Sequence, residues 1–227
     1  MVVFDMAGTT VEENNVVYKT LTRAINDRGF DVSLNEVLAQ GAGKEKLQAI
    51  RSVLAARRFV DEKIAVEIFE KFQVLLADAY QTLDVTEQPG TTEVFLALKN
   101  KGIGVVLNTG YNAVTAQNLI DKIGWKEGVH FDCLVTASDV GKNRPDPDMI
   151  LLAMKKLNIS DAGSVVKVGD SAVDIEEGQN AGCCLSIGIT TGAHTEQQLR
   201  QADPDFIVHK LTELIAIIER FPQQLPA

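Results

Sequence analysis

Three aspartates that lie at the ends of expected strands or one helical turn later are the residues of this chain best suited to chemistry. Asp5 follows the apolar residues 2–4, Asp170 follows a second apolar run, and Asp174 comes one helical turn later. Parallel strands end at the same edge of an open α/β sheet, so we expect these carboxylates to converge. Converging carboxylates repel one another unless a cation lies between them. Hard oxygen ligands suit Mg²⁺, and the sequence therefore predicts a magnesium site.

A hydroxyl and a basic side chain are placed to hold an anion beside these carboxylates. Thr109 follows the apolar residues 105–107, and its hydroxyl and the nearby N–H groups are suited to phosphoryl oxygens. Arg144 lies ahead of the strand that leads to Asp170, and a cation that reached these carboxylates would offset charge on a transferring phosphoryl group. Lys142 is the alternative for this role, and we favour Arg144.

The elements that must position these residues alternate along the chain. Strand patterns cover residues 2–4, 103–107, 133–136, 165–168, 184–187 and 206–208. Helix patterns follow several of them, over residues 112–123, 147–157 and 171–181. Strand and helix in alternation indicate a parallel sheet with helices on both faces. We therefore expect an α/β fold with a Rossmann-like, three-layer core.

The interval from about residue 12 to residue 85 breaks this alternation, because it holds helix patterns and no convincing strand. Apolar residues recur at helical spacing from Ile64 to Ala79 after a possible cap at Asp61. A helical insertion directly after the first strand would sit above the catalytic edge as a lid. We expect an α/β core over residues 1–11 and 87–227 and a small all-helical cap over residues 12–86.

The order of these motifs resembles the haloacid dehalogenase superfamily, whose members attack phosphorus with an aspartate. The resemblance implies that Asp5 is the nucleophile and forms an aspartyl phosphate. It also implies Mg²⁺ bound by Asp5, the backbone carbonyl of Ala7 and Asp170, with Asp174 bound directly or through water. The superfamily inserts its small helical cap after the first strand and places its conserved lysine or arginine where this chain has Arg144.

Ala7 narrows the resemblance. Most phosphatases of the superfamily carry at this position a second aspartate, which protonates the leaving group. The alanine, together with the run Thr109, Gly110 and Tyr111, resembles the phosphonoacetaldehyde hydrolases, or phosphonatases, and their close relatives. In this interpretation Thr109, Gly110, Tyr111 and Arg144 hold the phosphoryl group or the substrate.

Residues 43–51 resemble the phosphonatase segment that carries a Schiff-base lysine, which places Lys46 at that position. An iminium formed with the substrate aldehyde accepts the electrons that P–C cleavage releases. Such a lysine must be neutral, so Lys46 needs a pKa lowered by burial or by a nearby cation. Ala49 differs from the usual histidine, Ala42 from the usual methionine, and Asp174 is more typical of phosphatases. A surface lysine on a charged helix remains the alternative for Lys46.

Three functions follow from these residues. The leading hypothesis is a Mg²⁺-dependent hydrolase of a small phosphonate or organophosphate that acts through an aspartyl phosphate. The alternative is a phosphomonoesterase of the phosphoglycolate phosphatase type, with a substrate group or water replacing the missing acid. A non-catalytic binding protein is least favoured, because Asp5, Thr109, Arg144 and Asp170 are all retained.

Composition limits the partners of the chain. A net charge of −9 argues against nucleic acid as the main partner, and no apolar stretch approaches the roughly 20 residues of a membrane span. The first residues lack the pattern of a signal peptide. The 3 cysteines include an adjacent pair, which favours a reducing cytoplasm. We expect a cytoplasmic monomer or homodimer that acts on a small phosphonate or phosphate metabolite, without nucleic-acid or membrane partners.

Overall fold

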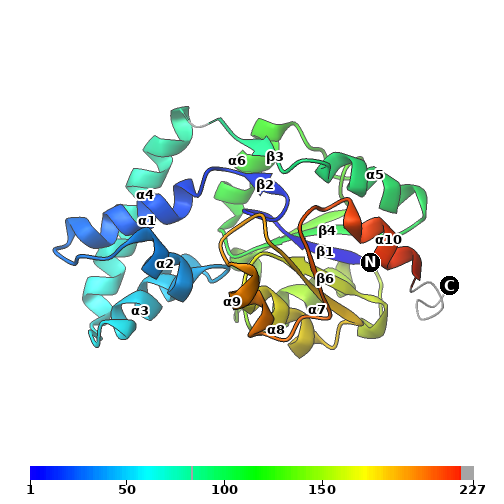
Figure 1. Cartoon of the computed structure of the whole chain (residues 1–227). Coiled ribbons are helices and arrows are strands. Elements are labelled where there is room, and N and C mark those ends of the chain that lie inside the picture. Colours follow the sequence, from blue (N-terminus) through cyan, green and yellow to red (C-terminus); the bar gives the residue numbers. More distant parts are fainter. Residues whose placement is uncertain (83, 221–227) are drawn as a thin grey trace.

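The computed structural model of the protein describes residues 1–82 and 84–220 and is built around a parallel sheet (Figure 1). The six strands lie in the order β5-β4-β1-β6-β7-β8. They are β1 (Val2–Asp5), β4 (Val105–Thr109), β5 (Cys133–Thr136), β6 (Val166–Gly169), β7 (Leu185–Ile189) and β8 (Phe206–Val208). Their apolar, largely buried sequences are typical of a parallel sheet covered on both faces. The predicted Rossmann-like α/β fold is confirmed.

Helices cover both faces of the sheet (Figure 1). One face carries α5 (Thr91–Asn100), α6 (Ala113–Ile123) and α10 (Glu213–Arg220). The other carries α7 (Asp148–Lys156), α8 (Ala172–Ala181) and α9 (Glu196–Arg200), and two short 3₁₀ helices, η1 (Ala137–Asp139) and η2 (Ala162–Ser164), complete the connections. None of the described helices combines the length and apolar character that crossing a bilayer requires.

Side-chain alternation along β1 divides the apolar interior between these two faces. Val2 and Phe4 belong to the large cluster under α5 and α6, whereas Val3 belongs to the cluster under α7. The predicted strands are all present, and their ends differ from the expected ones by at most two residues, as at the start of β4. Ile103, where the pattern began, donates its N–H to the Leu98 carbonyl at 3.0 Å, so it belongs to the exit from α5.

Four helices that follow β1 and precede α5 form the unit drawn in blue and cyan beside the sheet (Figure 1). They are α1 (Val16–Asp27), α2 (Leu34–Gly41), α3 (Lys46–Ala56) and α4 (Glu62–Thr82). Within the unit α1 packs on α4, and α3 packs on both α2 and α4. The Asp61 carboxylate accepts the Ile64 N–H at 3.1 Å, so the helix start expected there is present.

Two short strands join this helical unit to the sheet domain. β2 (Val11–Glu12) and β3 (Thr86–Glu87) pair antiparallel, so the segments that enter and leave the unit are hydrogen-bonded to each other. The sequence did not predict these strands, because two residues are too few to show a period. Of the segment expected to form the core, residues 221–227 lie outside the described residues.

The α3 helix begins at Lys46 because Glu45 caps it. The Glu45 carboxylate accepts the N–H groups of Leu47 and Gln48 at 3.0 and 2.9 Å. Satisfying these otherwise unpaired donors holds the first helical turn in place. The cap therefore fixes the position at which the Lys46 side chain leaves the backbone.

Three aromatic rings in contact link β1 to α5, and the burial of the central ring predicts the effect of a core substitution. Phe95 lies with its ring centroid 5.2 Å from that of Phe4 and 5.3 Å from that of Trp125, and it is fully buried. We expect Phe95→Ala to lower the free energy of unfolding by about 3–5 kcal/mol, because a cavity replaces the ring. Urea unfolding measures this, with Leu96→Ala, 41% exposed on the same helix, as the control. Equal unfolding midpoints for the two variants would contradict this assignment.

Candidate active site

The neighbouring strands β1 and β6 bring three carboxylates together at the carboxyl edge of the sheet. The register pairs Phe4 with Val168, so the two strands end side by side. Asp5, Asp170 and Asp174 each offer one oxygen, and these oxygens lie within 4.8 Å of one another. Each of the three residues is at most 4% exposed. The structure therefore brings together the acids that the sequence placed at one site.

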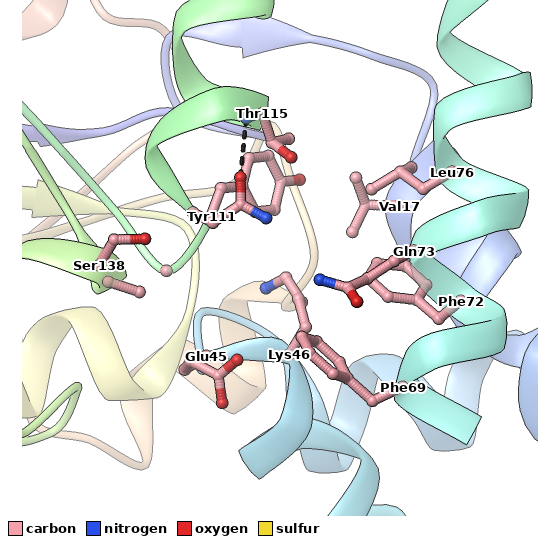
Figure 2. Close-up of a pocket in the computed structure, with 13 residues that line it drawn as sticks. Val17, Glu45, Lys46, Phe69, Phe72, Gln73, Leu76, Tyr111, Thr115 and Ser138 are labelled. Atoms are coloured by element: carbon pink, nitrogen blue, oxygen red, sulfur yellow. Dashed lines mark hydrogen bonds between the residues drawn. The ribbon is translucent and has the colours of Figure 1, made fainter. Parts of the chain in front are cut away.

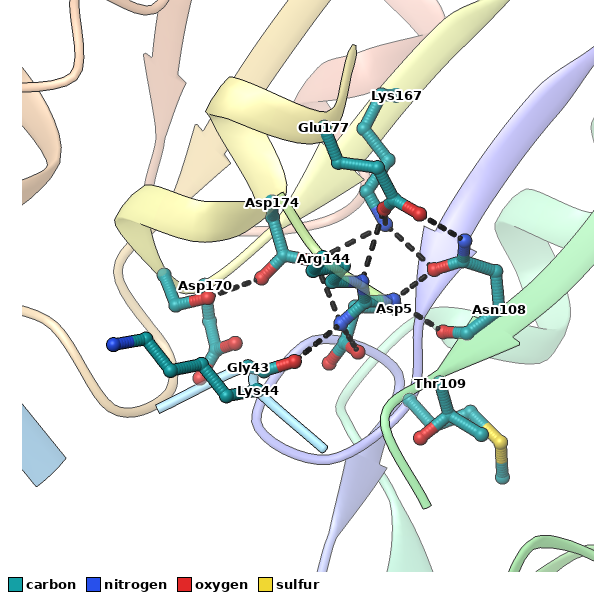
Figure 3. A network of polar contacts seen from close by, with 12 residues as sticks. Asp5, Gly43, Lys44, Asn108, Thr109, Arg144, Lys167, Asp170, Asp174 and Glu177 are labelled. Atoms are coloured by element: carbon teal, nitrogen blue, oxygen red, sulfur yellow. Dashed lines mark hydrogen bonds and ion pairs between the residues drawn. The ribbon is translucent and has the colours of Figure 1, made fainter. Parts of the chain in front are cut away.

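Arg144 is fully buried at the centre of the polar network in Figure 3. Its Nη1 donates to Asp5 Oδ1 at 2.6 Å and lies 2.9 Å from Asp174 Oδ1. Its Nη2 donates to the Asn108 carbonyl at 2.8 Å, and its Nε donates to Glu177 Oε2 at 2.9 Å. The guanidinium thus links the ends of β1 and β4 to α8.

Lys167 is a second buried cation in the same network, in the middle of β6. Its Nζ donates to Asn108 Oδ1 at 2.8 Å and lies 3.0 Å from both Asp174 Oδ1 and Glu177 Oε2. Glu177 is fully buried and also accepts a hydrogen bond from Asn108 Nδ2 at 2.9 Å. Two cations and the amide of Asn108 therefore hold Asp174 and Glu177 in place.

Sequence reasoning missed Lys167, Asn108 and Glu177, although two of them leave a signal. Lys167 is a charged residue inside an otherwise apolar strand, a position that a buried lysine occupies only with partners. Glu177 follows Asp174 by three residues, so both face the same side of α8. Glu177 is therefore a buried member of the network and not a solvated surface acid. Lys142, the alternative to Arg144, is exposed, so Arg144 is the member of this pair that reaches the site.

The three aspartates differ in their electrostatic surroundings. Burial raises the pKa of Asp5, an effect that the charge of Arg144 opposes. Burial would also raise the pKa of Asp174, but the charges of Arg144 and Lys167 outweigh it and hold that pKa below its ordinary value. Burial, reinforced by the charges of Asp5 and Asp174, raises the pKa of Asp170 well above its ordinary value.

Asp170 is therefore the carboxylate that lacks a compensating charge. Its Oδ2 accepts the N–H of Ala193 at 2.6 Å, and among the described residues the buried cations pair elsewhere. Two glycines let the chain approach it closely, since a Cβ at Gly8 or Gly192 would lie 2.3 or 1.9 Å from Oδ2. Converging carboxylate oxygens are the hard donors that Mg²⁺ prefers, and Asp170 lies at this point without an ion-pair partner among the described residues. The residues present fit a divalent cation at this point.

Ala7 lies in the turn between β1 and β2. A single bridge pairs it with Val11, and the neighbouring Gly8 donates its N–H to the Val11 carbonyl at 2.9 Å. The turn follows Asp5 directly, so it borders the group formed by Asp5, Asp170 and Asp174, the carboxylate cluster. A methyl side chain at this position can neither donate nor accept a proton.

The predicted phosphate-binding segment follows the end of β4. The Thr109 hydroxyl accepts the N–H of Tyr111 at 3.2 Å, and Thr109 is buried. Gly110 lies against the turn before α3, since a Cβ there would be 2.8 Å from the Gly43 carbonyl oxygen. The Gly43 carbonyl also lies 3.4 Å from Arg144 Nη1. The loop ahead of Lys46 therefore packs directly on the carboxyl edge of the sheet.

Lys46 lines a cavity of about 300 Å³ between α4 and the loop after β4 (Figure 2). Phe69, Phe72 and Leu76 of α4 form its apolar wall, and Tyr111 lies on the opposite side. Lys46 itself is 5% exposed, so its interpretation as a surface lysine is wrong.

The amine of Lys46 is held in a largely aromatic surrounding. Its Nζ donates to the Lys44 carbonyl at 2.6 Å and lies 4.9 and 5.0 Å from the ring centroids of Tyr111 and Tyr18. Burial lowers the pKa of Lys46 to about 8, although the charge of Asp5 acts against the shift. The neutral amine is therefore far more populated near neutral pH than that of an ordinary lysine, although the charged form still predominates.

Comparison with known proteins identifies the family. The model of the haloacid dehalogenase-like hydrolases matches residues 1–182. The chain belongs to the haloacid dehalogenase-like hydrolases. A relative named phosphonoacetaldehyde hydrolase, from Latilactobacillus sakei subsp. sakei (strain 23K), is 27% identical over 97% of this chain and 95% of its own. The name "Probable phosphatase IndB" belongs to a relative from Dickeya dadantii (strain 3937), 27% identical over 95% of this chain and 91% of its own.

A solved structure shares the fold of this hydrolase. The phosphonoacetaldehyde hydrolase-like protein from Oleispira antarctica superposes with a TM-score of 0.85 at 23% identity, over 99% of this chain and 92% of that one. The family and the fold that the motif order suggested are thus confirmed, and this protein is a hydrolase with phosphonoacetaldehyde hydrolases among its relatives.

The buried charge network predicts a large cost for removing one cation from this hydrolase. Lys167→Met leaves Asp174 and Glu177 with Arg144 as their remaining ion-pair partner. We expect the free energy of unfolding to fall by about 3–5 kcal/mol, since breaking a buried pair leaves an uncompensated charge. Chemical denaturation measures the change, and Lys155→Met, on the exposed face of α7, is the matched control. A loss no larger than that of the control would show that the network is not coupled to stability.

Proposed function

We propose that this hydrolase cleaves the P–C bond of a small phosphonate that carries an aldehyde. Lys46 carries the proposal, because its buried amine lines the cavity bordered by Gly110 and Tyr111, next to the carboxylate cluster. Ala7 supports it, since the alcohol of a phosphate ester leaves best when an acid at that position gives it a proton, and alanine has none to give. The phosphonoacetaldehyde hydrolases among the relatives point to the same substrate class.

A divalent cation, Mg²⁺ by the chemistry of its donors, is proposed at the carboxylate cluster. Asp5, Asp170 and the backbone carbonyl of Ala7 would hold it, and it would supply the charge that phosphoryl oxygens need. Asp174 would act through water, because Arg144 and Lys167 already pair with it. The charge balance agrees, since two buried cations, Arg144 and Lys167, face four buried carboxylates: Asp5, Asp170, Asp174 and Glu177. A divalent cation supplies the two positive charges that are missing.

The reaction that we propose proceeds through covalent intermediates on two residues of the protein, Lys46 and Asp5. The amine of Lys46 adds to the carbonyl carbon of the substrate, and the carbonyl oxygen leaves as water, which gives an iminium. An oxygen of Asp5 then bonds to phosphorus while the P–C bond breaks, and the electron pair of that bond moves into the iminium to form an enamine. Protonation of the enamine carbon and hydrolysis release the aldehyde, and a further water splits the aspartyl phosphate into phosphate and Asp5.

Other residues would position and balance charge during this transfer. Arg144 donates to Asp5 Oδ1, so it orients the attacking carboxylate and offsets charge on the phosphoryl group. Thr109 and the N–H of Gly110 would bind the phosphoryl oxygens, and Tyr111, whose N–H donates to the Thr109 hydroxyl, would orient that hydroxyl toward them. Residues 12–86 would act as a cap that places Lys46 over the substrate, with β2 and β3 as its hinge.

A phosphomonoesterase remains the second candidate function. It is favoured by the relative named as a phosphatase and by Asp174, which is more typical of phosphatases. Ala7 counts against it for the reason given above. Under either function we propose a small metabolite as substrate and a cytoplasmic monomer or homodimer, and the net charge of −9 supports the prediction that nucleic acid is not a partner.

The nucleophile is tested by Asp5→Asn. We expect phosphate release from phosphonoacetaldehyde to fall at least about a thousandfold, because an amide neither attacks phosphorus nor binds the cation as a carboxylate does. Initial rates in the presence of Mg²⁺ measure this, with Asp78→Asn, an exposed aspartate of α4, as the control. Activity within tenfold of the wild type would rule out an aspartyl phosphate on Asp5.

The imine is tested by trapping. Borohydride added with phosphonoacetaldehyde is expected to reduce the iminium and leave a stable adduct on Lys46, located by peptide mass spectrometry. Lys46→Arg is expected to abolish P–C cleavage, because arginine keeps the charge but forms no iminium. Lys44→Arg, whose lysine instead donates to Ser52 Oγ at 3.1 Å, should retain both the adduct and the activity. Full activity of Lys46→Arg, or no adduct with any aldehyde, would leave a phosphohydrolase without Schiff-base chemistry.

A further inference from the structure

A buried carboxylate beside Lys46 has no part in the reaction described so far. Glu13, in the segment between β2 and α1, is 3% exposed. Its Oε1 accepts a hydrogen bond from the Tyr111 hydroxyl at 2.9 Å, and its Oε2 accepts one from the Tyr80 hydroxyl at 3.0 Å. Tyr80 comes from α4 and Tyr111 from the loop after β4. Glu13 therefore ties the helical unit to the sheet domain at the cavity that Lys46 lines.

Tyr111 connects this carboxylate to the amine. Its hydroxyl bonds to Glu13, while its ring centroid lies 4.9 Å from Lys46 Nζ. The ring of Tyr18 lies 5.0 Å from the same nitrogen on another side. Aromatic faces attract a cation, and an iminium on Lys46 carries the same positive charge as the ammonium. A phenol that donates to a carboxylate is richer in electrons, so the Glu13 bond strengthens this attraction.

We propose that Glu13 is a positioning residue for Lys46, which holds the Tyr111 ring against the amine and supplies the buried negative charge that balances an iminium there. This inference rests on the proposed imine chemistry of Lys46. It adds a carboxylate outside the carboxylate cluster to the residues that the reaction depends on.

The other charged groups around Lys46 are committed to different partners. Asp5 is paired with Arg144, whose own positive charge acts against a cation on Lys46. Glu45 accepts the first N–H groups of α3 as the cap of that helix. Glu13 is buried, whereas Glu45 is partly exposed, and Glu13 accepts only neutral hydroxyl donors among its described side-chain partners. Among the described residues that act on Lys46, Glu13 is therefore the buried carboxylate without an ion-pair partner.

The directions of the pKa shifts agree with this coupling. Burial raises the pKa of Glu13 to about 7, an effect opposed by the two tyrosine hydroxyls and by the charge of Lys46. The charge of Glu13 in turn acts to raise the pKa of Lys46, but burial has the larger effect and lowers that pKa to about 8. Removing the Glu13 charge must therefore move the titration of Lys46 to lower pH.

The test compares Glu13→Gln with Glu12→Gln, a matched change at the exposed neighbour. Trace acetylation of Lys46 by acetic anhydride, followed across pH by peptide mass spectrometry, reads the free amine without any aldehyde. We expect its midpoint to shift to lower pH in Glu13→Gln and to stay at the wild-type value in Glu12→Gln. For phosphonoacetaldehyde we expect kcat to fall about tenfold in Glu13→Gln, which is the size of effect expected from weakening a desolvated cation interaction. We expect KM to stay within about twofold of the wild-type value, because Glu13 does not contact the phosphoryl group.

Glutamine keeps the shape and can still bond both tyrosines, and a urea midpoint equal to that of the wild type confirms that the fold is intact. An unchanged acetylation midpoint in folded Glu13→Gln would overturn the inference and leave Glu13 with a structural role alone. Tyr111→Phe supplies a second test, because it keeps the ring but removes the hydroxyl that donates to Glu13. A wild-type kcat in that variant would also contradict the inference. Absence of an aldehyde adduct on wild-type Lys46 would instead overturn the proposed imine. Acetylation uses no aldehyde, so it tests the coupling of Glu13 to Lys46 separately from the imine.

Discussion

The burial of one guanidinium is the interaction on which the site depends. Arg144 is fully enclosed, and its donors reach the ends of β1 and β4 and the first turns of α8. A buried charge of this kind is tolerated only when its partners surround it, so each of those elements must be in register for the fold to form. The same contacts aim the Asp5 carboxylate. Stability and the orientation of the proposed nucleophile therefore rest on one set of hydrogen bonds.

Much of the fold was predictable from local sequence, because parallel strands are continuous apolar runs and helix patterns follow several of them. The strand pair β2 and β3 was not, since two-residue strands leave no period. Asp5 and Asp170 could be placed because each stands at the end of a strand, whereas Arg144 was placed by the resemblance to the superfamily, which carries a conserved basic residue there. Lys167 and Glu177 were missed, although a lysine in an apolar strand is a sign of buried partners.

The surroundings of Lys46 could not be predicted, because they arise where α3, α4 and the loop after β4 meet. Resemblance to the phosphonatase segment selected the residue, but its burial and its aromatic neighbours depend on how the helical unit packs on the sheet domain. Glu13 left even less signal, since its partners Tyr80 and Tyr111 are distant in sequence. Tertiary packing thus decides whether a lysine is a solvated charge or an amine with a lowered pKa.

We propose that this hydrolase is suited to P–C cleavage rather than ester hydrolysis, since Ala7 provides no acid and Lys46 provides a buried amine. Measuring kcat/KM for phosphate release from phosphonoacetaldehyde and from 2-phosphoglycolate, on the same enzyme with Mg²⁺, distinguishes the two activities. We expect phosphonoacetaldehyde to be preferred by about a hundredfold or more, the contribution that a positioned acid makes to ester cleavage. Equal or faster hydrolysis of the ester, or no acetaldehyde formed alongside phosphate, would contradict it.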